Sequence, residues 1–549
     1  MKKSPFPFIL LLILASCTSE PETVIKPWVP YDQSSEIEAN SAHESQRMRY
    51  KLIQSRITDK NKIWKNVADQ IAYFSAEDYQ SLSSLILDQG IPTLQSHIQS
   101  GALTYEQLTQ WYLYRIAKYE NDSTSYLNNI ISINPDAVET ARQCDRNKSE
   151  SDHPLYGIPV LLKDNINFER LPTTAGTHLL QQNVAADAFI VNRIQDKGGI
   201  ILGKTTLSEW ANFLCLGCPN GYSAVGGQTL NPYGRKVHDT GGSSSGSGSA
   251  IAANYAAVAV GTETSGSILS PSSASSLVGL KPTTGLLSRN GIVPLSSTLD
   301  TPGPMTKSVI DNAIFLSAMT GEDMDDPATK GNRSGKAYWE EVTNGTLEGI
   351  RFGVNKSFME DSLYQANVDQ IIALGGIAIE FEPVEMDFEG FGELLSADMR
   401  RDLPDYLNSY APAEIRPRSI EEIVAYNADD STVRIPYGQG RFARILEANY
   451  SDEGLDSLRI RLRKAGKDFF EAAITPNELD FVLSINNWNA GHAAAANYPC
   501  LTIPMGYREN GRPMGLTFIS RPYQEAELLK VAYAFEQATK ARVLPTKYQ

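Results

Sequence analysis

The chain has 549 residues and a formal net charge of −15, and 42% of its residues are hydrophobic and 21% charged. This apolar content suffices for a large buried core, so wholesale disorder is excluded. Acidic residues outnumber basic ones by 64 to 49, which disfavours a nucleic-acid partner. The six histidines are scattered along the chain and argue against a histidine-based metal centre.

The first residues have the layout of a secretory signal peptide. Lys2 and Lys3 precede an unbroken apolar run over residues 8–15, which is shorter than the about 20 residues that span a bilayer. The run ends in Leu-Ala-Ser-Cys17, which resembles the bacterial lipobox, whose cysteine is lipidated and becomes the new N-terminus. An ordinary signal peptide with an incidental cysteine is the alternative.

The lipobox resemblance implies an exported protein that contacts the membrane only through lipid on Cys17. Residues 1–16 would be the lipoprotein signal peptide, and residues 17–34, rich in Pro, Ser, Thr and Glu, a flexible tether. Thr18 is not the aspartate that favours retention in the inner membrane, so we expect the periplasmic side of the outer membrane. No later segment is predicted to span a membrane.

The rest of the chain alternates between short apolar runs and segments with helical spacing. Residues 35–90 are predicted to form a polar-rich helical extension, and the helical pattern continues to residue 119. Strands are predicted over residues 156–163, 199–203, 256–260, 350–354, 377–381, 479–483 and 501–504, with helices over 190–197, 247–254 and near Val368. This alternation indicates an α/β fold built on a β-sheet.

Four cysteines follow Cys17. Cys215 and Cys218 form a CxxC pattern, whereas Cys144 and Cys500 stand alone. A zinc site would need a second ligand pair, which the sequence does not supply nearby. A local disulfide in an oxidising compartment or two plain buried thiols are the remaining interpretations, and both stay open.

The most unusual stretch is a serine–glycine tract over residues 241–249, Gly-Gly-Ser-Ser-Ser-Gly-Ser-Gly-Ser. A flexible linker is one interpretation, but this tract opens directly into a predicted helix and a buried strand. A phosphate-binding loop would need a Gly-Lys-Ser/Thr or GxGxxG pattern, which is absent. A second Gly/Ser loop, containing Ser267, follows Ser243 by 24 positions. A pair of catalytic loops at one edge of a sheet is therefore the third interpretation.

A serine nucleophile needs a base that removes its proton. His153, His178 and His238 are nearby in sequence, but none has a recognisable hydrolase context. Lys163 directly follows a predicted buried strand, where burial could keep it neutral. On residue type alone, an exposed lysine at a strand end is the simpler interpretation of Lys163.

Three motifs in order resemble the amidase signature family. They are Gly157-Ile-Pro-Val-Leu-Leu-Lys163-Asp, Gly241-Gly-Ser243-Ser-Ser-Gly, and Gly-Ser267-Ile with Gly279-Leu-Lys-Pro-Thr283. The similarity extends over about residues 91–545, and the amino-acid sequence of the two serine loops is most similar to that of the peptide amidase branch. The resemblance implies one domain, a single mixed sheet of about eleven strands covered by helices.

The resemblance also implies a Ser–cis-Ser–Lys triad. Ser267 would be the nucleophile, Ser243 would follow a cis peptide bond and relay the proton, and Lys163 would be the neutral base. Ser244 would hydrogen-bond within the triad. The backbone N–H groups of the nucleophile loop would form the oxyanion hole: Thr264, Ser265, Gly266 and Ser267.

The nucleophile loop departs from the common family pattern Asp-x-Gly-Gly-Ser-Ile-Arg at three positions. Glu263 stands for the aspartate, Ser265 for the first glycine and Leu269 for the arginine. The usual ion pair across the loop is therefore unavailable, which leaves the polarity of the substrate near Ser267 open.

These observations favour a lipid-anchored serine amidohydrolase that cleaves a carboxylic amide, such as a peptide C-terminal amide or an amino acid amide, without metal or cofactor. The partner would be a small-molecule or peptide amide, and residues of about 385–450 are expected to line its pocket. Two alternatives are the glutamine-hydrolysing component of a tRNA amidotransferase, which the export signal and acidic charge disfavour, and a non-catalytic amide-binding lipoprotein.

Overall fold

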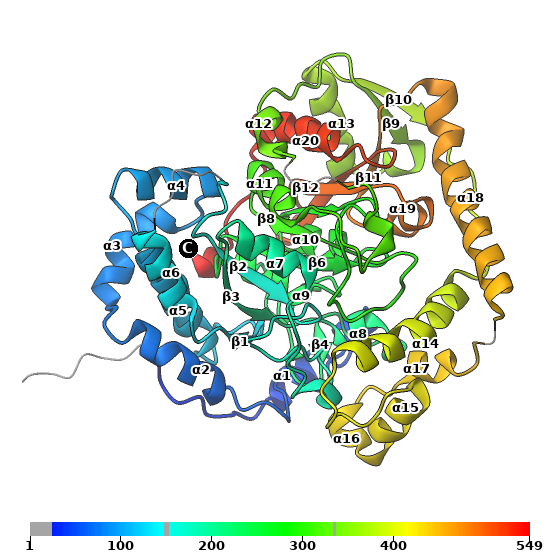
Figure 1. Ribbon diagram of the computed structural model, residues 1–549. Helices are drawn as coiled ribbons and strands as arrows, with labels where there is room; N and C mark the ends of the chain where they lie inside the picture. The colour runs from blue at the N-terminus through cyan, green and yellow to red at the C-terminus, as the bar shows by residue number, and fades with distance from the viewer. Residues whose placement is uncertain (1–24, 148–152, 333–335, 449) are drawn as a thin grey trace, which may run out of the picture.

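A computed structural model describes residues 25–147, 153–332, 336–448 and 450–549. Its centre is a mixed sheet of 11 strands in the order β1-β3-β2-β6-β8-β7-β12-β13-β11-β9-β10 (Figure 1). The strands are β1 Ile130–Ile133, β2 Pro159–Lys163, β3 Ile200–Thr205, β6 Val258–Glu263, β7 Val278–Lys281, β8 Thr301–Thr306, β9 Arg351–Asn355, β10 Ile377–Phe381, β11 Phe481–Ile485, β12 Cys500–Tyr507 and β13 Pro513–Ile519. Strands β4 Tyr222–Ser223 and β5 Gly227–Gln228 form a separate two-stranded ribbon. The predicted single α/β sheet is confirmed.

Helices cover the sheet in groups that contact one another. They are α1 Ser34–Asn40, α2 Asn61–Ala68, α3 Ala76–Ile86, α4 Ile91–Gln99, α5 Tyr105–Glu120, α6 Ala137–Arg146, α7 Phe189–Asp196, α8 Glu209–Asn212, α9 Ser245–Ala252, α10 Leu269–Ala274, α11 Val309–Met319, α12 Tyr338–Val342, α13 Ser362–Ala373, α14 Phe391–Tyr410, α15 Ile420–Asp429, α16 Ser431–Arg434, α17 Gly440–Ile445, α18 Asp452–Asn477, α19 Ala490–Ala496 and α20 Glu525–Thr539. Helices α9 and α10 pack together against central strands, and α7, α11, α12 and α20 form a second packed group.

Strands β1, β7, β8 and β13 were not predicted from the sequence, and β8 shows why. It contains Pro302 and Pro304, and proline normally argues against a central strand because it lacks an N–H donor. The structure pairs the whole of β8 with β6, whereas its pairing with β7 reaches only Met305 and Thr306. The two prolines therefore lie where β8 has a strand neighbour on one side only.

The N-terminal region packs against the domain from residue 25 onward. Residues 25–34 were expected to belong to the flexible tether, but Trp28 is only 8% exposed, its N–H donates to Asn61, and its ring lies edge-on to Tyr126. A single buried indole outweighs the polar composition of the stretch, because burying an aromatic side chain stabilises a segment strongly. Residues 1–24, with the predicted signal peptide and Cys17, lie outside the described residues.

The sheet brings the two predicted serine loops together. Strands β2 and β6 are neighbours and parallel, so their carboxyl ends, Lys163 and Glu263, reach the same edge. Helix α9, which begins directly after the serine–glycine tract, packs against both strands. Gly246 in its first turn allows the helix to approach the residue that follows β3, because a Cβ there would lie 2.4 Å from the Thr206 carbonyl oxygen.

A second apolar cluster lies beside this edge. Helices α14, α15 and α17, yellow in Figure 1, pack through it against the segment around Trp210 and Phe213, and the long helix α18 runs along the flank. These helices belong to the stretch of about residues 385–450 that was expected to line the pocket.

Candidate active site

The side chain of Lys163 is fully buried at the end of β2 and holds three hydrogen-bond contacts. Its Nζ lies 2.8 Å from Ser243 Oγ, 2.9 Å from Thr262 Oγ1 and 3.0 Å from the Thr262 carbonyl oxygen. A neutral amine has two N–H donors and one lone pair. Thr262 offers acceptors for both donors, so the lone pair is left facing Ser243, which is the orientation a proton acceptor requires.

Burial lowers the pKa of Lys163 to about 7. The negative charges of Asp300 and Glu263 have the opposite, smaller effect and raise this pKa. The cause of the lowering is desolvation, because an ammonium ion loses its hydration inside the protein. A substantial fraction of Lys163 is consequently neutral at physiological pH. The simpler interpretation, an exposed lysine at a strand end, is wrong.

Ser243 and Ser244 form the bridge between the two loops. The Gly242–Ser243 peptide bond is cis, as the resemblance implied. Ser244 is hydrogen-bonded to Thr262 in both directions through its Oγ, at 3.1 and 3.2 Å, and its N–H donates to the Ser267 carbonyl at 3.1 Å. Ser244 therefore braces the site through backbone groups rather than through a triad side chain.

Ser267 lies two residues before α10 and is 8% exposed. In the described chain its Oγ makes no hydrogen bond, so the contact that would connect it to Ser243 is not formed here. Catalytic hydrogen bonds often shorten only when substrate binds. The structure thus places the three predicted residues in one site and joins two of them directly by their side chains.

Glu263 organises the nucleophile loop. Its buried carboxylate accepts hydrogen bonds from the N–H groups of Gly266, Ile268 and Leu269 at 2.7, 2.6 and 3.0 Å. Burial raises its pKa, which these N–H donors and the charge of Lys281 oppose. Because the carboxylate is satisfied by the backbone, the loop holds its shape although Leu269 replaces the usual arginine.

The predicted oxyanion hole needs one correction. The Gly266 N–H is already bound by Glu263 and is not available to a substrate in this structure. The N–H groups of Thr264, Ser265 and Ser267 have no partner within the described residues. Unpaired N–H donors beside a serine are what an oxyanion hole requires.

Three supporting residues were not found from the sequence. Thr262 holds Lys163, Asn165 donates to Thr262 Oγ1 at 3.0 Å, and Asp300 accepts from Thr264 Oγ1 at 2.5 Å. Asn165 directly follows the Lys163-Asp pair and Thr262 lies within the Gly-Thr-Glu-Thr stretch before Ser265, so both had a positional signal. Asp300 had none, because it approaches only through the fold.

The other candidates lie apart from this site. Cys215 and Cys218 form a disulfide, which decides between the two open interpretations, and Cys144 and Cys500 are buried free thiols. His178 contacts Tyr426 at 2.5 Å and His238 packs beside Gly234; neither bonds the triad. Across the described ranges, no cluster of three or more His, Cys, Asp or Glu side chains could hold a metal ion. No helix in the same ranges is long and apolar enough to cross a membrane.

Known proteins share this sequence and architecture. A family model described as Amidase matches residues 107–390. A "Probable amidase" of Arabidopsis thaliana is 35% identical over 460 residues, covering 81% of this chain and 88% of the relative. A component of the glutamyl-tRNA(Gln) amidotransferase of Exiguobacterium sibiricum is 29% identical over 492 residues, covering 84% and 99%.

Solved structures agree with these matches. An amidase family protein from Bacillus anthracis superposes with a TM-score of 0.85 at 34% identity, covering 90% of this chain and 99% of that one. The peptide amidase from Stenotrophomonas maltophilia superposes with a TM-score of 0.79 at 36% identity, covering 84% and 98%. The chain therefore belongs to the amidase signature family.

Proposed function

We propose that this protein is a serine amidohydrolase that cleaves a carboxylic amide through an acyl-enzyme on Ser267. The observation that supports this most directly is the geometry of Lys163. Thr262 accepts both N–H donors of the neutral Lys163 amine, and the lone pair of Lys163 Nζ faces Ser243 Oγ at 2.8 Å. A fully buried lysine with a pKa of about 7 can accept a proton and return it near neutral pH.

In this mechanism Ser267 Oγ attacks the amide carbonyl while its proton passes through Ser243 to Lys163. The negative charge that develops on the carbonyl oxygen is met by the free N–H groups of Thr264, Ser265 and Ser267. The C–N bond then breaks, and the departing nitrogen takes the proton back along the same relay as ammonia or an amine. Water attacks the ester on Ser267 by the reverse route and releases the acid.

The peptide amidase from Stenotrophomonas maltophilia suggests the substrate class: a peptide with a C-terminal amide, or an amino acid amide. A panel of amidated peptides, amino acid amides and fatty amides, with ammonia release as the readout, tests this. Hydrolysis restricted to fatty amides would contradict the class.

Glutamine hydrolysis within a tRNA amidotransferase is the second candidate, favoured by the match to a component of such an enzyme. The formal charge of −15 disfavours it, because a protein of this charge repels a nucleic-acid substrate. Glutaminase activity greater than the activity on peptide amides would reverse this order.

A serine-reactive fluorophosphonate probe tests the nucleophile and separates an enzyme from a non-catalytic binding protein. We expect the wild type to be labelled and Ser267→Ala to be neither labelled nor active, with a melting temperature within a few degrees of wild type. Ser265→Ala is the matched control, since it lies in the same loop and should still be labelled. Labelling of Ser267→Ala would move the nucleophile elsewhere.

We further propose that the protein is exported and lipid-anchored at Cys17, at the periplasmic side of the outer membrane. The apolar run over residues 8–15 and the Leu-Ala-Ser-Cys17 tetrad support this. Palmitate should label the full chain and not Cys17→Ala, with Cys144→Ala as the control. Labelling of Cys17→Ala would refute the anchor, whereas the amidase proposal would be unaffected.

A further inference from the structure

A cavity of about 480 Å³ lies against the catalytic loops. Its walls come from the loop between β7 and β8, the turn around residues 325–327 and one side of helix α14. It reaches the active site at Asn165, Thr262 and Thr264, whereas Ser267 is not among its lining residues. A substrate whose amide lies at Ser267 could therefore extend into this cavity with another part of its structure.

The cavity is strongly acidic. Five carboxylates line it, from Asp300, Asp325, Asp326, Asp402 and Asp405, against the single guanidinium of Arg289. Such a concentration of one sign of charge in a half-open cavity raises the local concentration of counter-ions.

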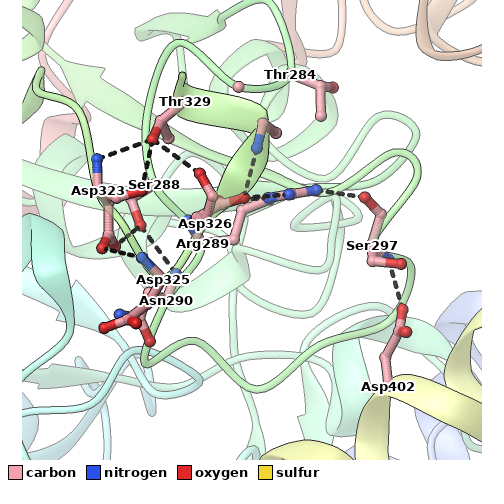
Figure 2. A network of polar contacts seen from close by, with 12 residues as sticks. Thr284, Ser288, Arg289, Asn290, Ser297, Asp323, Asp325, Asp326, Thr329 and Asp402 are labelled. Carbon is pink, nitrogen blue, oxygen red and sulfur yellow. Dashed lines mark hydrogen bonds and ion pairs between the residues drawn. The ribbon is translucent and has the colours of Figure 1, made fainter. Parts of the chain in front are cut away.

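The guanidinium does not neutralise the cavity. Arg289 is held by Asp326 through two contacts, Nε to Oδ2 at 2.8 Å and Nη2 to Oδ1 at 2.5 Å, and it also donates to the Ser297 carbonyl (Figure 2). Asp402 accepts from the Ser297 N–H at 2.7 Å and pairs with Arg401 at 2.9 Å. Two of the five carboxylates are thus already matched by arginines.

Asp325 and Asp405 remain without a cation. Both are exposed on the cavity wall, and no Lys, Arg or His in the described part of the chain forms an ion pair with either. Asp300 is held by Thr264 and by the N–H groups of Leu295 and Ser296, none of which carries charge. The carboxylates of Asp325 and Asp405 therefore line the cavity without an ion-pair partner in the described part of the chain.

Two further features suit an organic cation. Asn165 lines the cavity at its end nearest the triad, is 3% exposed, and has a buried Oδ1 that accepts no hydrogen bond. A buried acceptor without a donor is unfavourable, and an N–H group of a ligand that reached it would satisfy it. The stacked rings of Tyr406 and Tyr410 also line the cavity, and aromatic faces attract ammonium and guanidinium groups.

We propose that this cavity binds a cationic group, an ammonium or a guanidinium, carried by the amide substrate. The inference rests on the proposed amidase function and narrows its substrate class to amides with a positive charge away from the scissile bond. Asp325 and Asp405 are the specificity-determining residues, and the arginine-held Asp326 and Asp402 shape the wall.

Two matched pairs of substrates distinguish the sources of the cation. N-acetyl-lysyl-phenylalanine amide against N-acetyl-norleucyl-phenylalanine amide tests a side-chain ammonium. Alanyl-phenylalanine amide against its N-acetylated form tests a free N-terminus. We expect kcat/KM to be about tenfold higher for the cationic member of at least one pair, the sum of two favourable charge contacts in a partly enclosed site.

The double variant Asp325→Asn/Asp405→Asn should reduce the preference for the cationic member of each pair to about twofold. Glu393→Gln is the control, since Glu393 lies on the same helix α14 but outside the cavity, and it should keep the full preference. Equal rates within both pairs in the wild type, or a preference that survives in the double variant, would overturn the inference.

Binding keeps the inference testable even without turnover. Calorimetric titration of Ser267→Ala with the lysyl and norleucyl amides should show the same tenfold preference and the same loss in the double variant background. If no amide is hydrolysed but this preference is present, the proposed function fails and the cationic site stands. If amides are hydrolysed without a cationic preference, the reverse holds.

Discussion

The pH dependence of acylation tests the central argument about Lys163. Its pKa of about 7 means that about a tenth of the side chains are neutral at pH 6 and about nine tenths at pH 8. If the neutral lysine is the base, kcat/KM should rise about tenfold over this interval and by only about a tenth more up to pH 9. A lysine with its ordinary pKa of 10.5 would instead raise kcat/KM about a hundredfold from pH 6 to pH 8 and about tenfold more from pH 8 to pH 9.

The assay is ammonia release from an N-acetylated neutral peptide amide below saturation, since the substrate then contributes no ionisation of its own. The structure also predicts how the limb moves. The carboxylate of Asp300 raises the pKa of Lys163, so Asp300→Asn should shift the ascending limb to lower pH. Asp429→Asn, far along the chain on α15, serves as the control and should leave the midpoint in place.

Two results would refute this reasoning. A rate that continues to rise tenfold per pH unit through pH 9 would mean that burial does not lower the pKa of Lys163. A Lys163→Ala variant with near-normal turnover and the same profile would mean that another group is the base, and His178 and His238 would then be tested. Lys163→Arg should be inactive, because arginine stays protonated.

Three further predictions follow from the packing. Glu263→Gln puts an amide where a carboxylate accepts three N–H groups, so kcat should fall at least tenfold with KM little changed. Steady-state kinetics measure both constants, with Glu393→Gln as the control variant. An unchanged kcat would contradict the role of Glu263 in holding the loop. Lys163→Met should be more stable than the wild type, and the difference in unfolding free energy, measured by urea unfolding, should be about 2–3 kcal/mol larger at pH 6 than at pH 9. The reason is that the wild-type lysine binds a proton more readily in the unfolded chain, with a pKa of 10.5, than in the folded chain, with a pKa of about 7. A difference that does not change with pH would contradict the lowered pKa. Trp28→Ala should weaken the packing of residues 25–34 by about 3 kcal/mol and make them sensitive to limited proteolysis. Val29→Ala, at an exposed position, is the control and should leave these residues protected. Equal protection in both variants would contradict the anchoring role of the indole.

Much of the fold and the site could be predicted from local sequence. The apolar run that ends at Lys163 and the one before Glu263 indicate buried strands, and their parallel order brings the serine loops to one edge. The resemblance of the two Gly/Ser loops to the amidase signature family named Ser243 and Ser267 as candidates, and the structure places their loops in contact. Local patterning and motif spacing carry this information because the chemistry sits at the ends of regular elements.

Other features depend on residues that are distant in sequence. The pKa of Lys163 is set by burial, to which strands and helices from across the chain contribute, and no local pattern encodes that. Asp300 meets Thr264 only because β8 folds back along β6, and the prolines of β8 conceal that strand from a sequence analysis.

The substrate cavity is the clearest case of a feature decided by tertiary structure. Asp325 and Asp405 are ordinary acidic residues in the sequence and line one cavity only because the turn around residues 325–327, helix α14 and the loop between β7 and β8 come together in the fold. The sequence alone therefore determined the family and most strands of the sheet, whereas the tertiary structure decided the burial of Lys163 and the charge of the cavity beside it, because both depend on distances between segments that the chain brings together only by folding.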